Sequence, residues 1–310
     1  MTGTPAGPPA AVLRMGTYNT LNGGRDPRRR KRRSFLRVGR RYSHHRWARQ
    51  MDMLRELDLD VLCLQEAKHW GWYRLRATAR ALGMKGRLAR SRSHGCHLVT
   101  LVRPPLVTFA QFAPDIAEGT FHHTVSRAEL RVRGVDWTLR ALHTHSDPFS
   151  PEDRAGEARW LTEYGGRDDT LLIGDLNSEA PSDPQPASWD WLPPHLHSRH
   201  RFQNPDGTYG DGDRRAMHAL LRAGFQDPAD LGFGRHRTAG YWDPTERYDH
   251  RSDYILPTRR MLETRATLLS YETVDTELAR TLADHLLLVA TIGLRRTPPA
   301  LGTPRNASET

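Results

Sequence analysis

The sequence predicts a protein of the α/β (α+β) class that folds as one large domain. Strand-like apolar runs and amphipathic helical segments follow one another along the chain. Four strand-like stretches between residues 95 and 145 are so closely spaced that antiparallel pairing is expected. No internal repeat or linker divides the chain. A length of 310 residues and an apolar content of 37% are sufficient for a sizeable core.

The first half is expected to begin with strands at 12–18 and 60–65. The basic segment 25–46 and a helix beginning near Ser43 lie between these strands. Another amphipathic helix ends at Gly83. It carries Trp70 and Trp72, which with Tyr73 either pack in the core or form a platform for a base or sugar ring. The four closely spaced strands are expected at 95–102, 106–112, 122–132 and 135–145.

The second half opens with a helix start, because Ser150 is a good N-cap residue and Pro151 suits the first helical position. This helix leads into a buried strand at 170–173. The segment 178–212 is too long for a simple connection between two elements and is expected to form a surface insertion. The remaining expected elements are a helix at 214–224 and strands at 253–256, 264–269 and 285–292.

The domain is expected to span residues 12–294, with a disordered start at 1–11 and a disordered tail at 295–310. The longest apolar runs are far shorter than a membrane span, and the first residues do not resemble a secretory signal. Two cysteines exclude a disulfide framework and a cysteine-rich zinc site, and Cys63 is expected in the core. We therefore expect a cytoplasmic protein with no membrane partner, and a monomer.

The net charge of +10 is concentrated in the basic segment, where residues 25–46 contain eleven arginines or lysines and one acid, Asp26. Guanidinium groups match the geometry of phosphate. The segment is either a solvated, disordered loop or a phosphate-binding surface. On the second interpretation, the candidate phosphate- or nucleic-acid-binding residues are Arg28, Arg29, Arg30, Lys31, Arg32 and Arg33, together with Arg251 further along the chain.

Polar residues stand at the ends of most of the predicted strands. Asp175 and Asn177 follow a buried strand two residues apart, so both side chains point to the same side. Taken alone, an ordinary Asp/Asn turn explains them as well. His143 and His145 likewise share one face of their strand. The other polar strand ends are Asn19, Glu66, Asp253, Asp284 and His285.

Buried strands do not normally end in unpaired acids, because removing a carboxylate from water is costly. If these strand ends converge, they form a pocket of carboxylates, carboxamides and imidazoles. Oxygen-rich sites of this kind suit Mg²⁺ or Mn²⁺ rather than zinc. A hard cation beside an imidazole and a carboxylate that activates water is the equipment for phosphoester hydrolysis.

At these positions the sequence resembles the endonuclease/exonuclease/phosphatase superfamily, typified by deoxyribonuclease I. The matching motifs occur in the family's order: Thr17-Tyr18-Asn19, Leu64-Gln65-Glu66, Thr144-His145, Gly174-Asp175-Leu176-Asn177, Arg251-Ser252-Asp253-Tyr254-Ile255 and Ala283-Asp284-His285. They span most of the chain. The resemblance implies a four-layered sandwich, with two mainly antiparallel β-sheets packed face to face and flanked by helices.

The resemblance also implies residue roles. Glu66 would bind the divalent metal, Mg²⁺ or Mn²⁺, with Asn19 and Asp284 coordinating or orienting it. Asp175 would position or deprotonate the attacking water, and Asn177 would hold a non-bridging phosphoryl oxygen.

His285, oriented by Asp253, would contact the phosphate, and His145 would place a second imidazole on the phosphoryl group or the leaving oxygen. Two positions depart from the family pattern: Ala283 stands where a serine is usual, and His143 where an asparagine is usual.

Three functions remain open. The first is a metal-dependent nuclease or phosphodiesterase that attacks nucleic acid with an in-line water, because the excess positive charge falls between two polar strand ends, Asn19 and Glu66. The second is a phosphatase or phosphodiesterase acting on a phosphorylated metabolite or nucleotide. The third is a non-catalytic binding module on the same fold.

Overall fold

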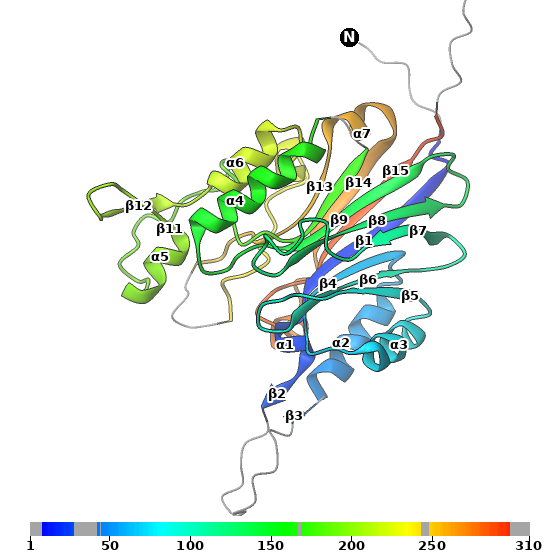
Figure 1. Cartoon of the computed structure of the whole chain (residues 1–310), viewed down its shortest axis with the longest axis horizontal. Coiled ribbons are helices and arrows are strands. Elements are labelled where there is room, and N and C mark those ends of the chain that lie inside the picture. The colour runs from blue at the N-terminus through cyan, green and yellow to red at the C-terminus, as the bar shows by residue number, and fades with distance from the viewer. Residues whose placement is uncertain (1–7, 28–41, 44, 167–168, 243–247, 298–310) are drawn as a thin grey trace, which may run out of the picture.

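Two β-sheets pack face to face, and helices cover their outer faces, so the chain forms four layers (Figure 1). The structure is a computed structural model, and it describes residues 8–27, 42–43, 45–166, 169–242 and 248–297. The architecture confirms the predicted sandwich of two mainly antiparallel sheets.

The first sheet has six strands in the order β14-β15-β1-β4-β6-β5. They are β1 (Ala11–Asn19), β4 (Val61–Lys68), β5 (Lys85–Ala89), β6 (Cys96–Val102), β14 (Ala266–Thr273) and β15 (Leu288–Leu294). Strands β1 and β4 are parallel, and the other neighbours are antiparallel. Thr17 pairs with Leu288, so the residues that precede β15 lie beside the end of β1.

The second sheet has five strands in the order β13-β10-β9-β8-β7. They are β7 (Val107–Ala113), β8 (Thr124–Val132), β9 (Thr138–His145), β10 (Thr170–Asp175) and β13 (Asp253–Pro257). Strands β9 and β10 are parallel. At the end of β10, Asp175 pairs with His145 on one side and with Asp253 on the other.

The central core lies between the two sheets. Leu13, Met15 and Cys63 of the first sheet meet Leu139 and Ile173 of the second, and all five side chains are buried. Alternate residues of each strand reach this core because successive side chains point to opposite faces of a sheet. The burial of Cys63 confirms that it is a core residue.

Four helices form the outer layers. Helices α2 (His45–Glu56) and α3 (Trp72–Ala81) cover the first sheet, where Met51 and Leu75 pack against Leu64. Helices α4 (Pro151–Leu161) and α6 (Arg215–Arg222) cover the second sheet, where Met217 packs against Leu172. The Ser150 hydroxyl accepts a hydrogen bond from the amide of Asp153, which confirms the predicted N-cap.

Several short elements complete the chain. The first turn after β1 is α1 (Leu21–Gly24), and β2 (Asp26–Pro27) pairs with β3 (Tyr42–Ser43). The predicted insertion contains α5 (His197–His200), β11 (Arg201–Gln203) and β12 (Tyr209–Gly212). Helix α7 is Arg259–Thr264, and single 3-10 turns are Thr162–Tyr164, Pro194–Leu196, Pro228–Leu231 and Ala279–Thr281.

Some element boundaries differ from the predictions. Strands β8, β9 and β15 begin two or three residues later than expected, and β5 and α7 were not predicted. Trp70 packs edge-on against Trp47 in the core, whereas Trp72 and Tyr73 are exposed.

Disorder was predicted for residues 1–11 and 295–310, of which 1–7 and 298–310 lie outside the described residues. The prediction is wrong at Ala11, which begins β1, and at Arg295, whose backbone amide donates to the carbonyl of Arg265 at 2.8 Å. Within the described part of the chain, no helix is long and apolar enough to cross a membrane.

Candidate active site

The candidate site lies where the ends of the two parallel strand pairs meet. Strand β1 ends at Asn19, β9 at His145 and β10 at Asp175. Because parallel strands carry their carboxyl ends to the same edge, residues distant in sequence converge there. Strand β13 begins at Asp253 beside Asp175, and His285 precedes β15.

A glycine makes this convergence possible. Gly174 has a φ of +147°, and a Cβ atom there would lie 1.9 Å from the carbonyl oxygen of Thr144 on the neighbouring strand. Any side chain would therefore force β9 and β10 apart just before Asp175. Gly174 therefore permits the close approach of the two strands at this point.

Asp175 is the centre of the hydrogen-bond network. Its Oδ2 accepts a hydrogen bond from the amide of Asn19 at 3.0 Å, and its Oδ1 accepts one from the hydroxyl of Ser252 at 2.7 Å. The imidazoles of His145 and His285 lie 3.5 and 3.7 Å from Oδ2. Burial alone raises the pKa of Asp175, but His285, His145 and the two hydrogen bonds lower this pKa to about 2. The carboxylate is therefore ionised at neutral pH.

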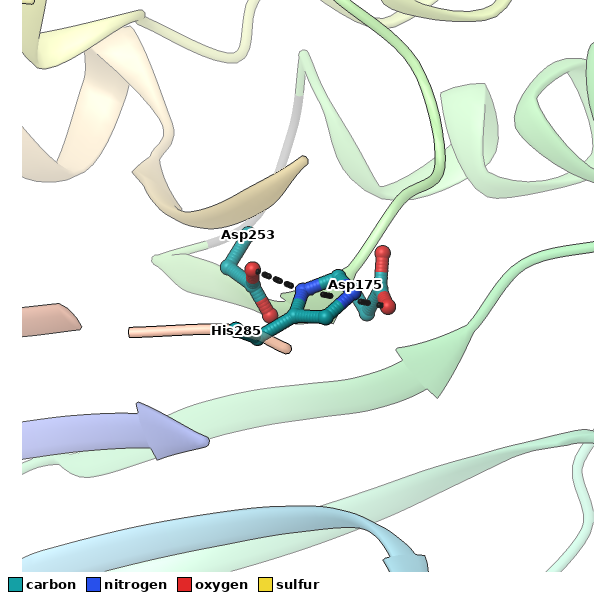
Figure 2. A group of neighbouring side chains, drawn as sticks. All are labelled: Asp175, Asp253 and His285. Atoms are coloured by element: carbon teal, nitrogen blue, oxygen red, sulfur yellow. Dashed lines mark hydrogen bonds and ion pairs between the residues drawn. The ribbon is translucent and has the colours of Figure 1, made fainter. Parts of the chain in front are cut away.

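His285 lies between two carboxylates, as Figure 2 shows. Its Nδ1 is 2.7 Å from Oδ2 of Asp253, which is 1% exposed. Burial lowers the pKa of His285, but Asp253 and then Asp175 oppose this and hold the pKa well above its usual value. Since Nδ1 is held by Asp253, the charged ring presents Nε2–H as a donor.

His145 faces Asp175 from the opposite side. Its ring stacks on that of His123, with centroids 4.4 Å apart, and its Nδ1 is buried with no hydrogen-bond partner among the described residues. His143, two residues earlier, is structural instead: its two ring nitrogens contact Gln65 at 2.7 Å and Thr100 at 3.1 Å. Only one of the two histidines on this face therefore reaches the site.

Asn177 and Glu66 both have the left-handed backbone conformation, which is uncommon outside glycine. The side-chain amide of Asn177 donates to the carbonyl of Ser146 at 3.0 Å, so its second N–H remains for another acceptor. Glu66 lies at an irregularity in the pairing of β4 with β6. Bulges of this kind redirect a side chain. Oε2 of Glu66 accepts a hydrogen bond from the backbone amide of Asn22 at 2.6 Å.

Glu66 and Asp284 are the best candidates for a metal site. Oδ1 of Asp284 is buried with no hydrogen-bond partner among the described residues. Burial raises the pKa of Asp284 to about 6; the His285 charge opposes this, and the Glu66 charge adds to it. A buried carboxylate whose ionisation is opposed by burial and by a neighbouring carboxylate fits a hard divalent cation, which would supply a counter-charge.

Among the described residues, Asp175, Asp253 and His285 also have metal-binding geometry, because their possible ligand atoms lie within 4.8 Å of one another. His285 Nδ1 is already hydrogen-bonded to Asp253, however, and could bind an ion only by giving up that bond. We therefore favour Glu66 and Asp284. Asn19 turns its amide nitrogen toward Asp175, so the structure places it as an orienting group for that carboxylate.

The structure brings together eight residues singled out from the sequence: Asn19, Glu66, His145, Asp175, Asn177, Asp253, Asp284 and His285. Arg251 is a correction. Its guanidinium is 4% exposed and donates hydrogen bonds to both Asp183 and Asp227, so it is not available to a phosphate. The run from Arg28 to Arg33 lies outside the described residues.

Sequence reasoning assigned no role to Ser252 or His123. Ser252 lies next to Asp253 in the motif that resembles the family, and this position could have identified it as a site residue. His123 comes next to Asp175 only through strand pairing, since Thr124 is the partner of His145. No local pattern could have indicated it.

Comparison with known proteins shows to which family the chain belongs. Residues 16–285 match the Endonuclease/Exonuclease/phosphatase family. No curated protein sequence matches significantly.

Three solved structures that share the fold cover most of the chain. An endonuclease/exonuclease/phosphatase from Bacteroides vulgatus is 15% identical, covers 92% of this chain and 100% of its own, and has a TM-score of 0.62. An AP endonuclease from Archaeoglobus fulgidus is 20% identical, with coverages of 90% and 98% and a TM-score of 0.57. A mannosyl-6-phosphatase from Bacteroides thetaiotaomicron is 14% identical, with coverages of 91% and 99% and a TM-score of 0.55.

The chain therefore belongs to the Endonuclease/Exonuclease/phosphatase family, whose members are phosphoester hydrolases.

Proposed function

We propose that this chain is a Mg²⁺- or Mn²⁺-dependent phosphodiesterase that cleaves nucleic acid by in-line attack of water on phosphorus. The observation that carries the proposal is the ionised, buried Asp175, flanked by two imidazoles. A carboxylate orients the water, and the imidazoles face the charge that develops on the phosphoryl group.

Each residue has a separate part in this mechanism. Asp175, held by Asn19 and Ser252, accepts a hydrogen bond from the attacking water and fixes its direction. The charged His285 donates from Nε2 to a phosphoryl oxygen, and the free N–H of Asn177 donates to another. His145 faces the leaving oxygen. A divalent cation between Glu66 and Asp284 would lower the pKa of a bound water and offset the phosphoryl charge.

The position of the basic segment supports nucleic acid as the substrate. At its base, Arg46 is 8% exposed and pairs with Asp26 at 2.8 Å. The same guanidinium donates to the carbonyl oxygens of Thr20 and Leu21. These residues belong to the turn in which Asn22 contacts Glu66, so Arg46 and Asp26, near the two described ends of the basic segment, lie close to the proposed metal site.

A phosphatase acting on a phosphorylated metabolite is the second candidate. It is favoured by a small polar pocket that adjoins the site and has Asn177 and Ser252 in its wall. A pocket of this kind suits a compact ligand better than a long strand.

The first test is hydrolysis of bis(p-nitrophenyl) phosphate with and without Mg²⁺. We expect Mg²⁺-dependent hydrolysis that falls by about 10²- to 10⁴-fold in Asp175→Asn and in His285→Ala. Asp206→Asn and His218→Ala replace exposed residues of the same types and serve as matched controls. Full activity in both site variants would refute the proposed chemistry.

The second test assigns the substrate. Residues 28–41 are replaced by Asn-Gly, which preserves the pairing of Pro27 with Tyr42 and the contact between Asp26 and Arg46. We expect this variant to lose salt-sensitive cleavage of DNA or RNA but to keep hydrolysis of the aryl diester. Unchanged cleavage of polynucleotides in this variant would contradict the role of the basic segment, and absence of polynucleotide cleavage in the wild-type protein would favour the metabolite phosphatase.

A further inference from the structure

The small pocket beside the active site has a lining rich in basic groups. Its lining residues come from α4, the α5 region of the insertion and the loops that follow β10 and precede β13; α4 and α5 are on the left in Figure 1. One wall contains Asn177 and Ser252, both of which hydrogen-bond to Asp175. The opposite wall contains Arg154, Arg199 and His200. The pocket therefore shares a wall with the catalytic centre.

Arg154 is 3% exposed, yet no carboxylate lies within ion-pair distance of it among the described residues. Its guanidinium donates to the carbonyl oxygens of Asp147 and Arg199, both at 2.9 Å. A buried guanidinium normally has a charged partner, because burying an unpaired charge is costly. Burial lowers the pKa of Arg154, and the charges of Asp213, Asp147, Glu157 and Asp175 oppose this without any of them pairing directly with the guanidinium. The guanidinium therefore has no direct anionic partner among the described residues.

Arg199 adds a second positive charge at the rim. Its guanidinium lies over the ring of Phe149, 4.8 Å from the ring centroid, which restrains its position. It too has no carboxylate within ion-pair distance among the described residues. Between these arginines lies His200, whose pKa is lowered to about 3 by burial, then by His250 and by the charges of Arg154 and Arg199. Positive potential is therefore concentrated in the pocket.

The two carboxylates in the lining do not cancel this charge. Glu179 accepts hydrogen bonds from Arg214 at 3.2 Å and from the hydroxyl of Tyr248 at 2.7 Å. Asp213 accepts one from the guanidinium of Arg215 at 2.7 Å. Each of these acids is thus hydrogen-bonded to an arginine of its own, and neither pairs directly with Arg154 or Arg199.

The geometry points to a second phosphate subsite: the pocket binds a further phosphate group of the same substrate, next to the one that is hydrolysed. This inference rests on the proposed function, because Asn177 and Ser252 connect the pocket to the proposed water-orienting carboxylate. Two guanidinium groups and an imidazole N–H match the oxygens of a phosphate. The second phosphate belongs either to a polynucleotide backbone or to a bisphosphorylated small molecule.

The test uses chromogenic substrates that differ by one phosphate. The first pair is thymidine 3'-(p-nitrophenyl phosphate) with and without a 5'-phosphate, and the second is thymidine 5'-(p-nitrophenyl phosphate) with and without a 3'-phosphate. In the wild-type protein we expect the extra phosphate to raise kcat/KM by about 10- to 100-fold in one of the pairs, since each charged hydrogen bond is worth about that factor.

Arg199→Gln and Arg154→Gln should each remove most of this gain, whereas Arg222→Gln, an exposed arginine on α6, should retain it. Because Arg154 is buried, Arg199→Gln carries the test if Arg154→Gln does not fold. A wild-type protein that gains nothing from the second phosphate in either pair would overturn the inference. Persistence of the gain in the folded variants would do the same.

Failure of the proposed function gives a different result, in which none of these diesters is hydrolysed. The pocket can then be tested by calorimetric titration with thymidine 3',5'-bisphosphate and with thymidine 5'-phosphate. At least tenfold tighter binding of the bisphosphate, lost in Arg199→Gln, supports the subsite. Equal binding of the two nucleotides contradicts it. To separate the two sources of the phosphate, an oligonucleotide and the bisphosphate compete for the wild-type pocket, and the stronger competitor identifies the source.

Discussion

Two buried arginines near the site, Arg251 and Arg154, are equally hidden but differently partnered. Arg251 is 4% exposed and directs its guanidinium at two carboxylates, Asp183 and Asp227, at 2.7 Å each. Arg154 is 3% exposed and contacts only backbone carbonyl oxygens. Arg251 is therefore neutralised, and its ion pair with Asp183 links the insertion to the start of β13. Arg154 has no carboxylate within ion-pair distance among the described residues, although Asp213, Asp147, Glu157 and Asp175 lie close enough for their charges to act on it.

The difference teaches that burial alone does not tell whether an arginine is structural or functional. A buried charge with well-placed partners is satisfied, and removing one partner exposes the other to the full cost of burial. A buried charge without a counter-ion retains its capacity to bind one. Three predictions test this distinction, from the largest expected effect to the smallest.

Arg251→Gln should cost about 3–5 kcal/mol of the free energy of unfolding, because it leaves two buried carboxylates uncompensated. Urea unfolding measures the loss. Arg235→Gln is the matched control, since Arg235 contacts the same Asp183 at 3.4 Å but is exposed. Its loss should stay below about 1 kcal/mol. Equal losses in the two variants would mean that burial does not increase the cost of removing a paired arginine.

The pH dependence of stability should reveal whether Glu157 balances Arg154. Burial raises the pKa of Glu157 to about 7 from 4.5, against hydrogen bonds from two backbone amides and the Arg154 charge. Below pH 7 the folded protein keeps a proton that the unfolded chain releases near pH 4.5. The stabilisation from this proton is therefore complete below pH 4.5 and is lost as the pH rises through 7, by about 3 kcal/mol.

The measurement compares wild type with Glu157→Gln, which remains neutral throughout, by urea unfolding between pH 4.5 and 8. Relative to the variant, wild type should become less stable as the pH rises. A flat difference would mean that Glu157 is ionised in the folded protein and serves as the counter-ion of Arg154.

Arg154→Gln should cost only about 1 kcal/mol, because the loss of hydrogen bonds to two carbonyl oxygens is offset by removal of a buried, unpaired charge. The same urea series gives this value, with Arg222→Gln expected within about 0.5 kcal/mol of wild type. A loss as large as that of Arg251→Gln would indicate that Arg154 already has a charged partner.

Much of the fold was predictable because its signals are local. The helix start at Ser150 and Pro151 depends on neighbouring residues, and the buried strand before Gly174 is a continuous apolar run. Strand β5 was missed because it lies at a sheet edge, where only Ala89 is buried and no apolar alternation remains. The order of the strand-end motifs pointed to the residues that converge in the site.

What could not be predicted depends on contacts distant in sequence. Arg251 lies in a motif that resembles the family, but its partners Asp227 and Asp183 are 24 and 68 residues away in the sequence. Only the folded structure shows that these carboxylates pair with its guanidinium. The pocket likewise assembles from α4, the insertion and the loop before β13. No local pattern distinguishes Arg154 from the many other arginines of the chain.

The pairing of the first strand with β15 has a consequence for the order of synthesis. Ala11 pairs with Leu294, and His285 and Asp284 reach the site only when β15 is inserted between β14 and β1. A ribosome must therefore release the chain beyond residue 294 before Asp175 meets its charged imidazole. A nascent chain arrested earlier lacks Asp284 and His285 at the site, and it also lacks Leu286 and Leu287 of the apolar cluster that contains Trp70.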